Sequence, residues 1–244
     1  MLEKVTTIEE GVRKLFTVRK QTIPHFTLTS RQQGEYTDIL EWNGRRIPLL
    51  DSHFDMLIQN ISEYGSNATQ NSALHVYSFR GNNITLSQLI YQEIDIAEYI
   101  LHSRVKKITA FVNKNAVSLI AVMENGTCAN MDLGNSMTPG SQNQCQHRLI
   151  TKHGMANDRI VGNMTFQHQI NVYGVDSAVP VTYDDDEYYL YGLSDEQIRK
   201  VAAVYAVLTG NEAYDVWIKN DIRYQAIVEA VYESDKQGKT VYLL

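Results

Sequence analysis

The sequence lacks the short motifs with which many enzymes hold nucleotides. None of its 14 glycines falls in a Gly-x-Gly pattern, so the glycine-rich turn of a dinucleotide-binding domain is missing from this sequence. Residues 238–240 resemble the end of a phosphate-binding loop, but Glu233 stands where the first glycine of such a loop must be. A Gly-x-Ser-x-Gly nucleophile motif is absent as well. The sequence therefore offers no standard nucleotide cradle and no serine-hydrolase signature.

Cysteine and clustered positive charge are scarce. Cys128 and Cys145 are too few for a disulfide scaffold or a thiolate zinc site, so we expect both to be reduced strand or core residues. The formal net charge is −6, which argues against binding to a nucleic-acid backbone. No apolar run approaches the ~20 residues that cross a bilayer, and no charged-then-apolar leader is seen. We therefore expect a cytoplasmic protein without nucleic-acid or membrane partners.

Local metal motifs are missing too. The seven histidines show neither His-x-x-x-His nor Glu-x-x-His spacing, so a metal site would need ligands from distant parts of the chain, and we predict none. The acidic residues 184–187 would alternate between the two faces of a strand, which favours an exposed strand end over a cation site. Tyr188, Tyr189 and Tyr191 could stack on a sugar, but we favour sheet and core aromatics.

The composition that remains is that of an ordinary globular protein, with 43% hydrophobic and 20% charged residues among 244. Apolar periodicity and capping residues, with Asp51 as the cap of the second helix, predict helices at residues 7–20, 52–64, 85–103, 194–209 and 212–237. Between residues 105 and 190 the chain is rich in β-type runs broken by short turns, of which Asn125-Gly126 is a strong hairpin signal.

This order of elements predicts an α+β fold with one broad, largely antiparallel sheet and helices packed on one face. The runs "ITAFV" and "VSLIAVM" indicate that the other face of the sheet is partly apolar. An uncovered apolar face favours a partner, so we predict a homo-oligomer that forms through the open sheet face.

Three polar residues of the predicted helix at 85–103 share one of its faces. Gln88, Gln92 and Asp95 are spaced by four and three residues, which brings their side chains close together. From the residues alone, this set is either the polar side of an amphipathic helix or a binding site.

Four stretches, in the same order, resemble the C-terminal domain of the Gfo/Idh/MocA oxidoreductases. They are "IYQEIDIAEYIL…VKKITAFV", "VSLIAVMENGTCANMDLG", "RLITKHGMANDRIV" and "AIVEAVYESDKQGKTVYL". At the start of the chain, Glu3-Lys4 stands where that family has Glu-Lys-Pro after a Rossmann strand. The resemblance implies that residues 1–30 are a remnant helix and strand of a Rossmann domain whose nucleotide-binding half is missing. Residues 31–244 would then be the C-terminal α+β domain.

The resemblance also implies where a substrate would lie. In the family, the lysine and an Asp-x-x-x-His pair flank the substrate, and the histidine is assigned the proton transfer. Alignment on Asp95 places Gln88 on that aspartate and Gln92 on that histidine, so Lys4, Gln88 and Gln92 would be vestigial catalytic positions. An amide cannot act as a general base near neutral pH, but it can form hydrogen bonds with sugar-type hydroxyls. Gln88, Gln92 and Asp95 are thus candidate substrate-binding residues.

We therefore expect a truncated pseudoenzyme that is not catalytic alone, has no cofactor of its own, and binds a small sugar-like ligand or a partner. An alternative is the substrate half of an NAD(P)-dependent sugar or inositol oxidoreductase, with the Rossmann half and its NAD(P) on a separate or missing polypeptide. A third is a ligand-independent structural subunit.

Overall fold

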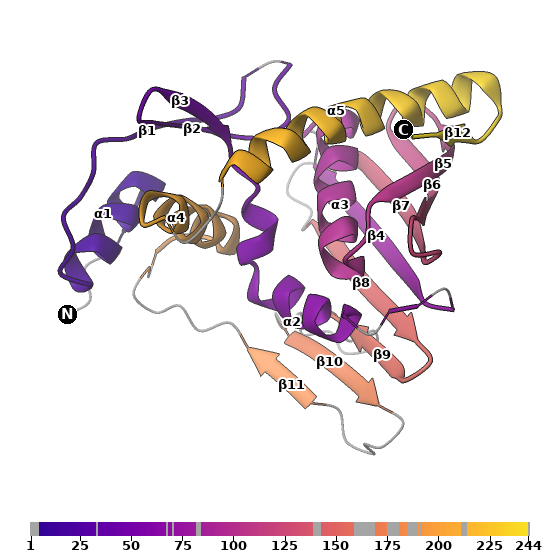
Figure 1. Cartoon of the computed structure of the whole chain (residues 1–244), viewed down its shortest axis with the longest axis horizontal. Helices are drawn as coiled ribbons and strands as arrows, with labels where there is room; N and C mark the ends of the chain where they lie inside the picture. Colours follow the sequence, from indigo (N-terminus) through magenta and orange to yellow (C-terminus); the bar gives the residue numbers. More distant parts are fainter. Residues whose placement is uncertain are drawn as a thin grey trace. The chain divides into compact units, whose positions relative to one another are not determined.

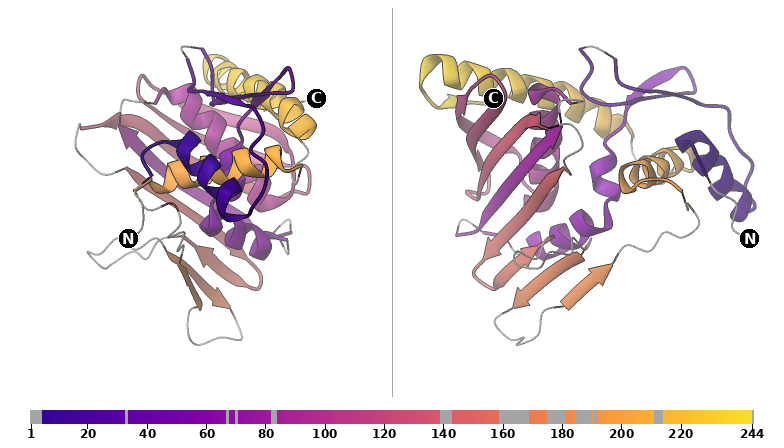
Figure 2. Two further views of the ribbon diagram at one scale, coloured as in Figure 1. Left: turned by 90° about the vertical axis from the view of Figure 1, so that its left-hand side faces the viewer. Right: turned by 180° about the vertical axis from the view of Figure 1, so that it is seen from behind.

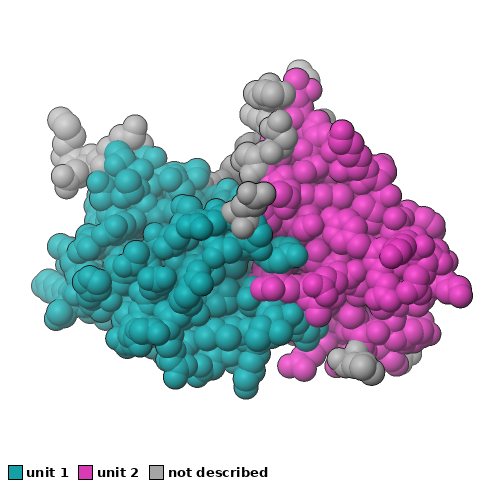
Figure 3. Space-filling view, turned by 90° about the horizontal axis from the view of Figure 1, so that it is seen from above, with its two compact units in different colours: residues 1–55, 186–223 teal, residues 56–185, 224–244 magenta. Residues whose placement is uncertain are grey.

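The computed structural model describes residues 5–32, 34–66, 68–69, 71–81, 84–138, 143–158, 169–174, 181–184, 190, 192–210 and 214–243. The chain divides into two compact units, unit 1 with residues 1–55 and 186–223 and unit 2 with residues 56–185 and 224–244 (Figure 3). The sequence predicts a boundary near residue 30, between a Rossmann remnant and the C-terminal domain. That boundary concerns the origin of the two segments, whereas the two units are defined by packing, so it stays a prediction. Among the described helices, none is both long and apolar enough to cross a membrane.

Unit 1 is built from helices and a small antiparallel sheet. Helix α1 begins with a capping box, in which the side chains of Thr7 and Glu10 accept each other's backbone N–H groups. A Cβ on Gly11 would lie 2.7 Å from Val201 Cγ2, so glycine allows α1 and α4 to pack closely. The elements are α1 (Ile8–Val18), β1 (Thr27–Thr29), β2 (Ile39–Trp42), β3 (Arg45–Pro48), the 3₁₀ helix η1 (Asp51–Phe54), α4 (Asp195–Leu208) and the start of α5 (Tyr214–Gln237).

The structure corrects the role expected for Asp51. This residue lies in η1 instead of capping a helix, and α2 (Met56–Gly65) begins only after it. The cause is an ion pair, because Arg199 of α4 places Nη1 2.7 Å from Asp55 Oδ2 and Nε 3.6 Å from Asp51 Oδ2. Burial raises the pKa of Asp51, although the guanidinium opposes this rise.

Unit 2 contains a nine-stranded sheet in the order β11-β10-β9-β8-β4-β7-β6-β5-β12. Only β4 and β7 run parallel, and every other neighbouring pair is antiparallel, as predicted. The strands are β4 (Ala73–Gly81), β5 (Val105–Val112), β6 (Ala116–Met123), β7 (Cys128–Met137), β8 (Gln144–Thr151), β9 (Gly154–Asn157), β10 (Gln169–Gly174), β11 (Val181–Asp184) and β12 (Val241–Tyr242). The α+β prediction is confirmed.

The helices of unit 2 gather on one face of this sheet (Figure 1). Helix α3 (Leu86–Leu101) contacts β4 and β7, and α2 contacts β8, β9 and α3. The final part of α5 is tied to β5, because the Ala110 backbone N–H donates to Ser234 Oγ at 3.0 Å. Among the described residues of unit 2, no helix covers the opposite face of the sheet (Figure 2).

Helix α3 is at the centre of the core of unit 2. Its periodic apolar side chains are almost completely buried, as a helix between a sheet and other helices requires. The buried set includes Leu89, Ile90, Ile94, Ala97, Ile100 and Leu101. Gly65 ends α2 against this helix, and a Cβ at that position would lie 2.0 Å from the Ile100 carbonyl oxygen. The close approach of α2 to α3 therefore requires glycine at this position.

We expect Gly65→Ala to lower the free energy of unfolding by about 3 kcal/mol, because the added methyl group meets backbone that cannot rotate away. Glu63→Ala, at an exposed position of the same helix, should change it by less than about 0.5 kcal/mol. Urea denaturation followed by circular dichroism measures both. Equal effects of the two substitutions would contradict the close approach.

Candidate functional site

Gln88 is placed by the start of helix α3. Thr85 caps this helix, and its Oγ1 accepts the Gln88 backbone N–H at 3.1 Å. In return, Gln88 Oε1 accepts the Thr85 backbone N–H at 3.0 Å. The side chain that aligns with the family's aspartate is therefore part of a capping box, which is a structural task.

The other candidates predicted on this helix differ in burial. Asp95 is 2% exposed, whereas Gln92 is partly exposed. Of the three residues that share this face, Gln92 is thus the one best placed to meet a small molecule. Lys4, and also Tyr188, Tyr189 and Tyr191 of the predicted sugar-stacking group, lie outside the described residues.

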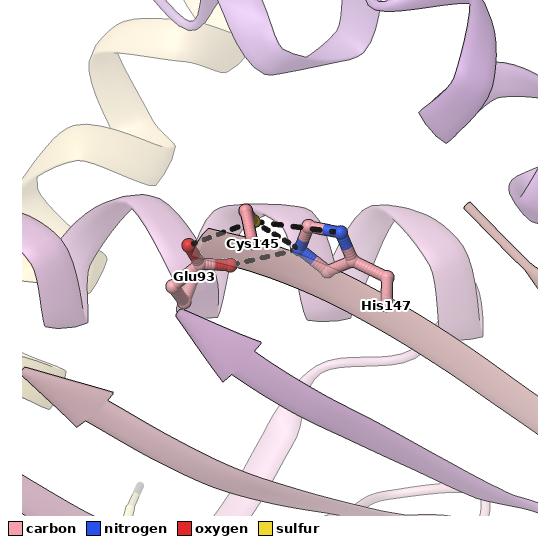
Figure 4. A group of neighbouring side chains, drawn as sticks. All are labelled: Glu93, Cys145 and His147. Carbon is pink, nitrogen blue, oxygen red and sulfur yellow. Dashed lines mark hydrogen bonds and ion pairs between the residues drawn. The ribbon is translucent and has the colours of Figure 1, made fainter. Parts of the chain in front are cut away.

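A second polar cluster lies on the side of α3 that faces the sheet. Glu93 projects from α3 and is completely buried, and its Oε2 lies 2.9 Å from Nε2 of His147 on β8 (Figure 4). On the other side of the imidazole, His147 Nδ1 donates to Asp158 Oδ2 at 2.6 Å. Asp158 Oδ1 also accepts the His147 backbone N–H at 2.7 Å. The imidazole is held between two carboxylates that come from different elements.

Cys145 and Arg80 complete this cluster. Cys145 precedes His147 by two residues on β8, so both side chains point to the same face of the sheet. Cys145 Sγ lies 4.0 Å from Glu93 Oε1 and 4.0 Å from the imidazole nitrogens. Arg80 Nη2 lies 3.7 Å from Glu93 Oε1. We call Glu93, Cys145, His147, Asp158 and Arg80 the α3–β8 cluster.

The electrostatics of the cluster oppose the usual effect of burial. Burial disfavours the charged form of Glu93, but the charge and hydrogen bond of His147, together with Arg80, hold the pKa of Glu93 below its ordinary value. Burial likewise disfavours the imidazolium, but Cys145 and the Asp158 carboxylate raise the pKa of His147 well above its ordinary value. Both shifts favour an ion pair between the Glu93 carboxylate and the His147 imidazolium.

Chemically, the cluster combines a sulfur, an imidazole nitrogen and a carboxylate oxygen that all lie within 4.8 Å of one another. Sequence reasoning missed this convergence because Glu93 and Cys145 are 52 residues apart. Two signals were available: a carboxylate at a core position of α3, and the Cys-x-His alternation of β8. Both cysteines are free and lie on strands, as expected.

Comparisons of sequence place the chain in no known family: no family model and no curated protein matches it. Comparisons of structure are informative. An oxidoreductase from Agrobacterium radiobacter in complex with NAD⁺, L-tartaric acid and magnesium is similar, with a TM-score of 0.61, 14% identity, and coverage of 98% of this chain and 70% of that one. The transcriptional regulator Gal80p from Kluyveromyces lactis has a TM-score of 0.64, 13% identity, and coverage of 97% and 66%.

A structure of a putative oxidoreductase from Thermotoga maritima is similar as well, with a TM-score of 0.60 and 9% identity. That match covers 81% of this chain, and the chain spans only 63% of the length of that protein. At these identities the likeness establishes the fold. The resemblance to Gfo/Idh/MocA-type oxidoreductases that the motifs indicated is thereby confirmed at the level of the fold.

We expect Glu93→Ala to cost about 3–5 kcal/mol of stability, because it leaves a buried imidazolium without its partner on α3. Gln92→Ala, one residue along the helix, should cost less than about 1 kcal/mol because Gln92 is partly exposed. Chemical denaturation of both variants in the presence of EDTA measures the difference. Similar losses for the two would show that the ion pair of Glu93 does not stabilise unit 2.

Proposed function

We propose that the chain is a non-catalytic relative of the Gfo/Idh/MocA oxidoreductases that acts as a self-associating binding module. The observation that carries this proposal is the identity of two residues on helix α3. The positions that align with the family's acid–base pair are Gln88 and Gln92, and Gln88 is engaged in the helix cap. An amide has no pKa that would let it take a proton from a hydroxyl near neutral pH.

The choice of a non-enzymatic role has a precedent in the fold. Gal80p, which matches nearly the whole of this chain, is described as a transcriptional regulator. Fold alone does not dictate function, so the argument still depends on the residues of α3. The ligand we propose is a small polyhydroxylated molecule, because an amide can both donate to and accept from hydroxyl groups. The protein from Agrobacterium radiobacter holds L-tartaric acid, a ligand of this chemical class.

A second candidate function follows from the coverage of the matches. Two of the similar oxidoreductase chains extend well beyond the matched part, since this chain spans 63% and 70% of their lengths. The chain could then supply the substrate-binding half of an NAD(P)-dependent oxidoreductase, with the nucleotide-binding half on another polypeptide. The two candidate functions can be distinguished by testing whether the purified chain binds NAD(P) and oxidises a polyol.

We expect the purified chain to bind no NAD⁺ or NADP⁺, because its sequence has no Gly-x-Gly turn. We also expect it to oxidise no sugar or inositol, because Gln88 and Gln92 occupy the positions that align with the family's acid–base pair. A ligand at 100 times its dissociation constant should add ~2.7 kcal/mol of stability, which a thermal-shift screen of polyols and sugar acids detects. Gln92→Ala should abolish that shift, and Glu63→Ala, at an exposed position of α2, should keep it. Polyol oxidation by the chain alone would contradict the proposal.

The proposed self-association uses the open sheet face, which we define as the face of the nine-stranded sheet opposite α3. Phe111, Ile120 and Tyr77 are 71%, 48% and 45% exposed there. Asp132 and Arg148 share this face, so it has charges of both signs. A two-fold dimer uses the same patch on both copies, and a patch that is partly apolar and has charges of both signs can pair with itself in this way. We therefore propose that the open sheet face binds a second copy of this chain.

Light scattering at micromolar concentration should return at least twice the 27.8 kDa of one chain. Ile120→Glu should reduce the measured mass to that of a single chain, because it buries a charge in the apolar part of the interface. The matched control is Ile222→Glu, which places the same charge at a 67% exposed position of unit 1 and should leave the mass unchanged. A wild-type mass of 27.8 kDa would contradict self-association.

A further inference from the structure

The α3–β8 cluster brings three kinds of metal-ligating atom together. A thiol, an imidazole and two carboxylates meet between the helix and the sheet, and Glu93 and His147 are 0% and 2% exposed. Buried charged groups are either paired with one another or coordinate a metal, and this set of side chains offers both states. We propose that Glu93, Cys145 and His147 bind one divalent transition-metal ion of the zinc type, with Asp158 fixing the imidazole.

The chemistry of the three ligands suits this class of ion. Zinc accepts cysteine sulfur, histidine nitrogen and carboxylate oxygen, and three protein ligands leave a fourth tetrahedral position for water. Magnesium and calcium prefer oxygen ligands alone, so the thiolate and the imidazole argue against them. The three ligands alone therefore favour a transition-metal ion over magnesium or calcium.

The distances are close to those that a tetrahedral ion requires. Metal–ligand bonds of about 2.0–2.3 Å at tetrahedral angles place ligand atoms about 3.3–3.6 Å apart. His147 Nε2 lies 2.9 Å from Glu93 Oε2 and 4.0 Å from Cys145 Sγ, and one ligand atom from each of the three residues lies within 4.8 Å of the others. No distance would change by more than about 1.5 Å on binding. Side-chain rotation alone can supply such movements, because Cys145 is only partly buried.

Asp158 supplies the second carboxylate that such sites need. Histidine ligands usually donate their other ring N–H to a carboxylate or carbonyl group, which fixes the tautomer and turns the free nitrogen toward the metal. His147 Nδ1 makes this contact with Asp158 Oδ2 at 2.6 Å. The backbone N–H of His147 holds the other oxygen of the same carboxylate, so the orientation is fixed at both ends. Nε2 is thereby directed to the space that it shares with Glu93.

The net charge of the loaded cluster also fits a buried site. A Cys145 thiolate and the carboxylates of Glu93 and Asp158 provide three negative charges. A divalent ion and Arg80 provide three positive charges, so the loaded cluster is neutral. Arg80 lies 3.7 Å from Oε1 of Glu93, whereas His147 lies against Oε2, so the guanidinium and the ion can use different oxygens. Such an ion would join α3 directly to β8.

The test uses the full chain, stripped with EDTA and titrated with Co²⁺ as a spectroscopic substitute for Zn²⁺. We expect a thiolate-to-cobalt charge-transfer band and tetrahedral d–d bands that saturate at one equivalent, and Zn²⁺ should displace both. Cys145→Ser should remove the charge-transfer band. Cys128→Ser, which changes the other partly buried cysteine on a strand, should leave it intact. Asp158→Asn should weaken the affinity by about 10–100-fold.

A second measurement needs no variant and therefore does not depend on how Cys145→Ser folds. Stoichiometric Zn²⁺ should slow the alkylation of Cys145 by iodoacetamide at least about tenfold and leave Cys128 unchanged, as followed by peptide mass spectrometry. The proposal is overturned if Co²⁺ at one equivalent produces no thiolate band. Equal alkylation of Cys145 with and without Zn²⁺ overturns it as well.

Discussion

The pairing of Glu93 with His147 is the constraint on which the core of unit 2 depends. Glu93 is completely buried in the middle of α3, and a carboxylate in that position is tolerated only when it is paired and hydrogen-bonded. His147 supplies the pairing from β8, and Asp158 balances the charge that His147 then bears. The packing of α3 on the sheet is therefore specified by geometry and charge together.

The position of α3 also accounts for the layout around it. The helix connects β4 to β5 along the chain, and it packs across β4 and β7. β4 and β5 run in the same direction with β7 and β6 between them, and two parallel strands of one sheet are usually joined by a crossover through a helix. Gly65 then lets α2 reach the carbonyl of Ile100 near the end of α3. The core of unit 2 is thus built outward from one helix.

Much of this fold was accessible from the sequence because its signals are local. The capping boxes at Thr7, Thr85 and Ser194 precede α1, α3 and α4, and the turn at Asn125-Gly126 joins β6 to β7. The role of Asp51 was predicted wrongly because its partner, Arg199, is distant in sequence. The α3–β8 cluster was missed for the same reason. Spacing rules detect ligands within one element, whereas Glu93, His147 and Asp158 meet only through the tertiary fold.

Neighbouring residues of α3 have separate tasks, and this separation bears on function. Gln92 and Glu93 lie about 100° apart around the helix, so one is partly exposed while the other points into the core. A substitution at position 92 therefore changes the exposed side of α3 without touching the ion pair that holds the helix. This independence means that binding at Gln92 and metal coordination at Glu93 can be tested separately, although both depend on one helix.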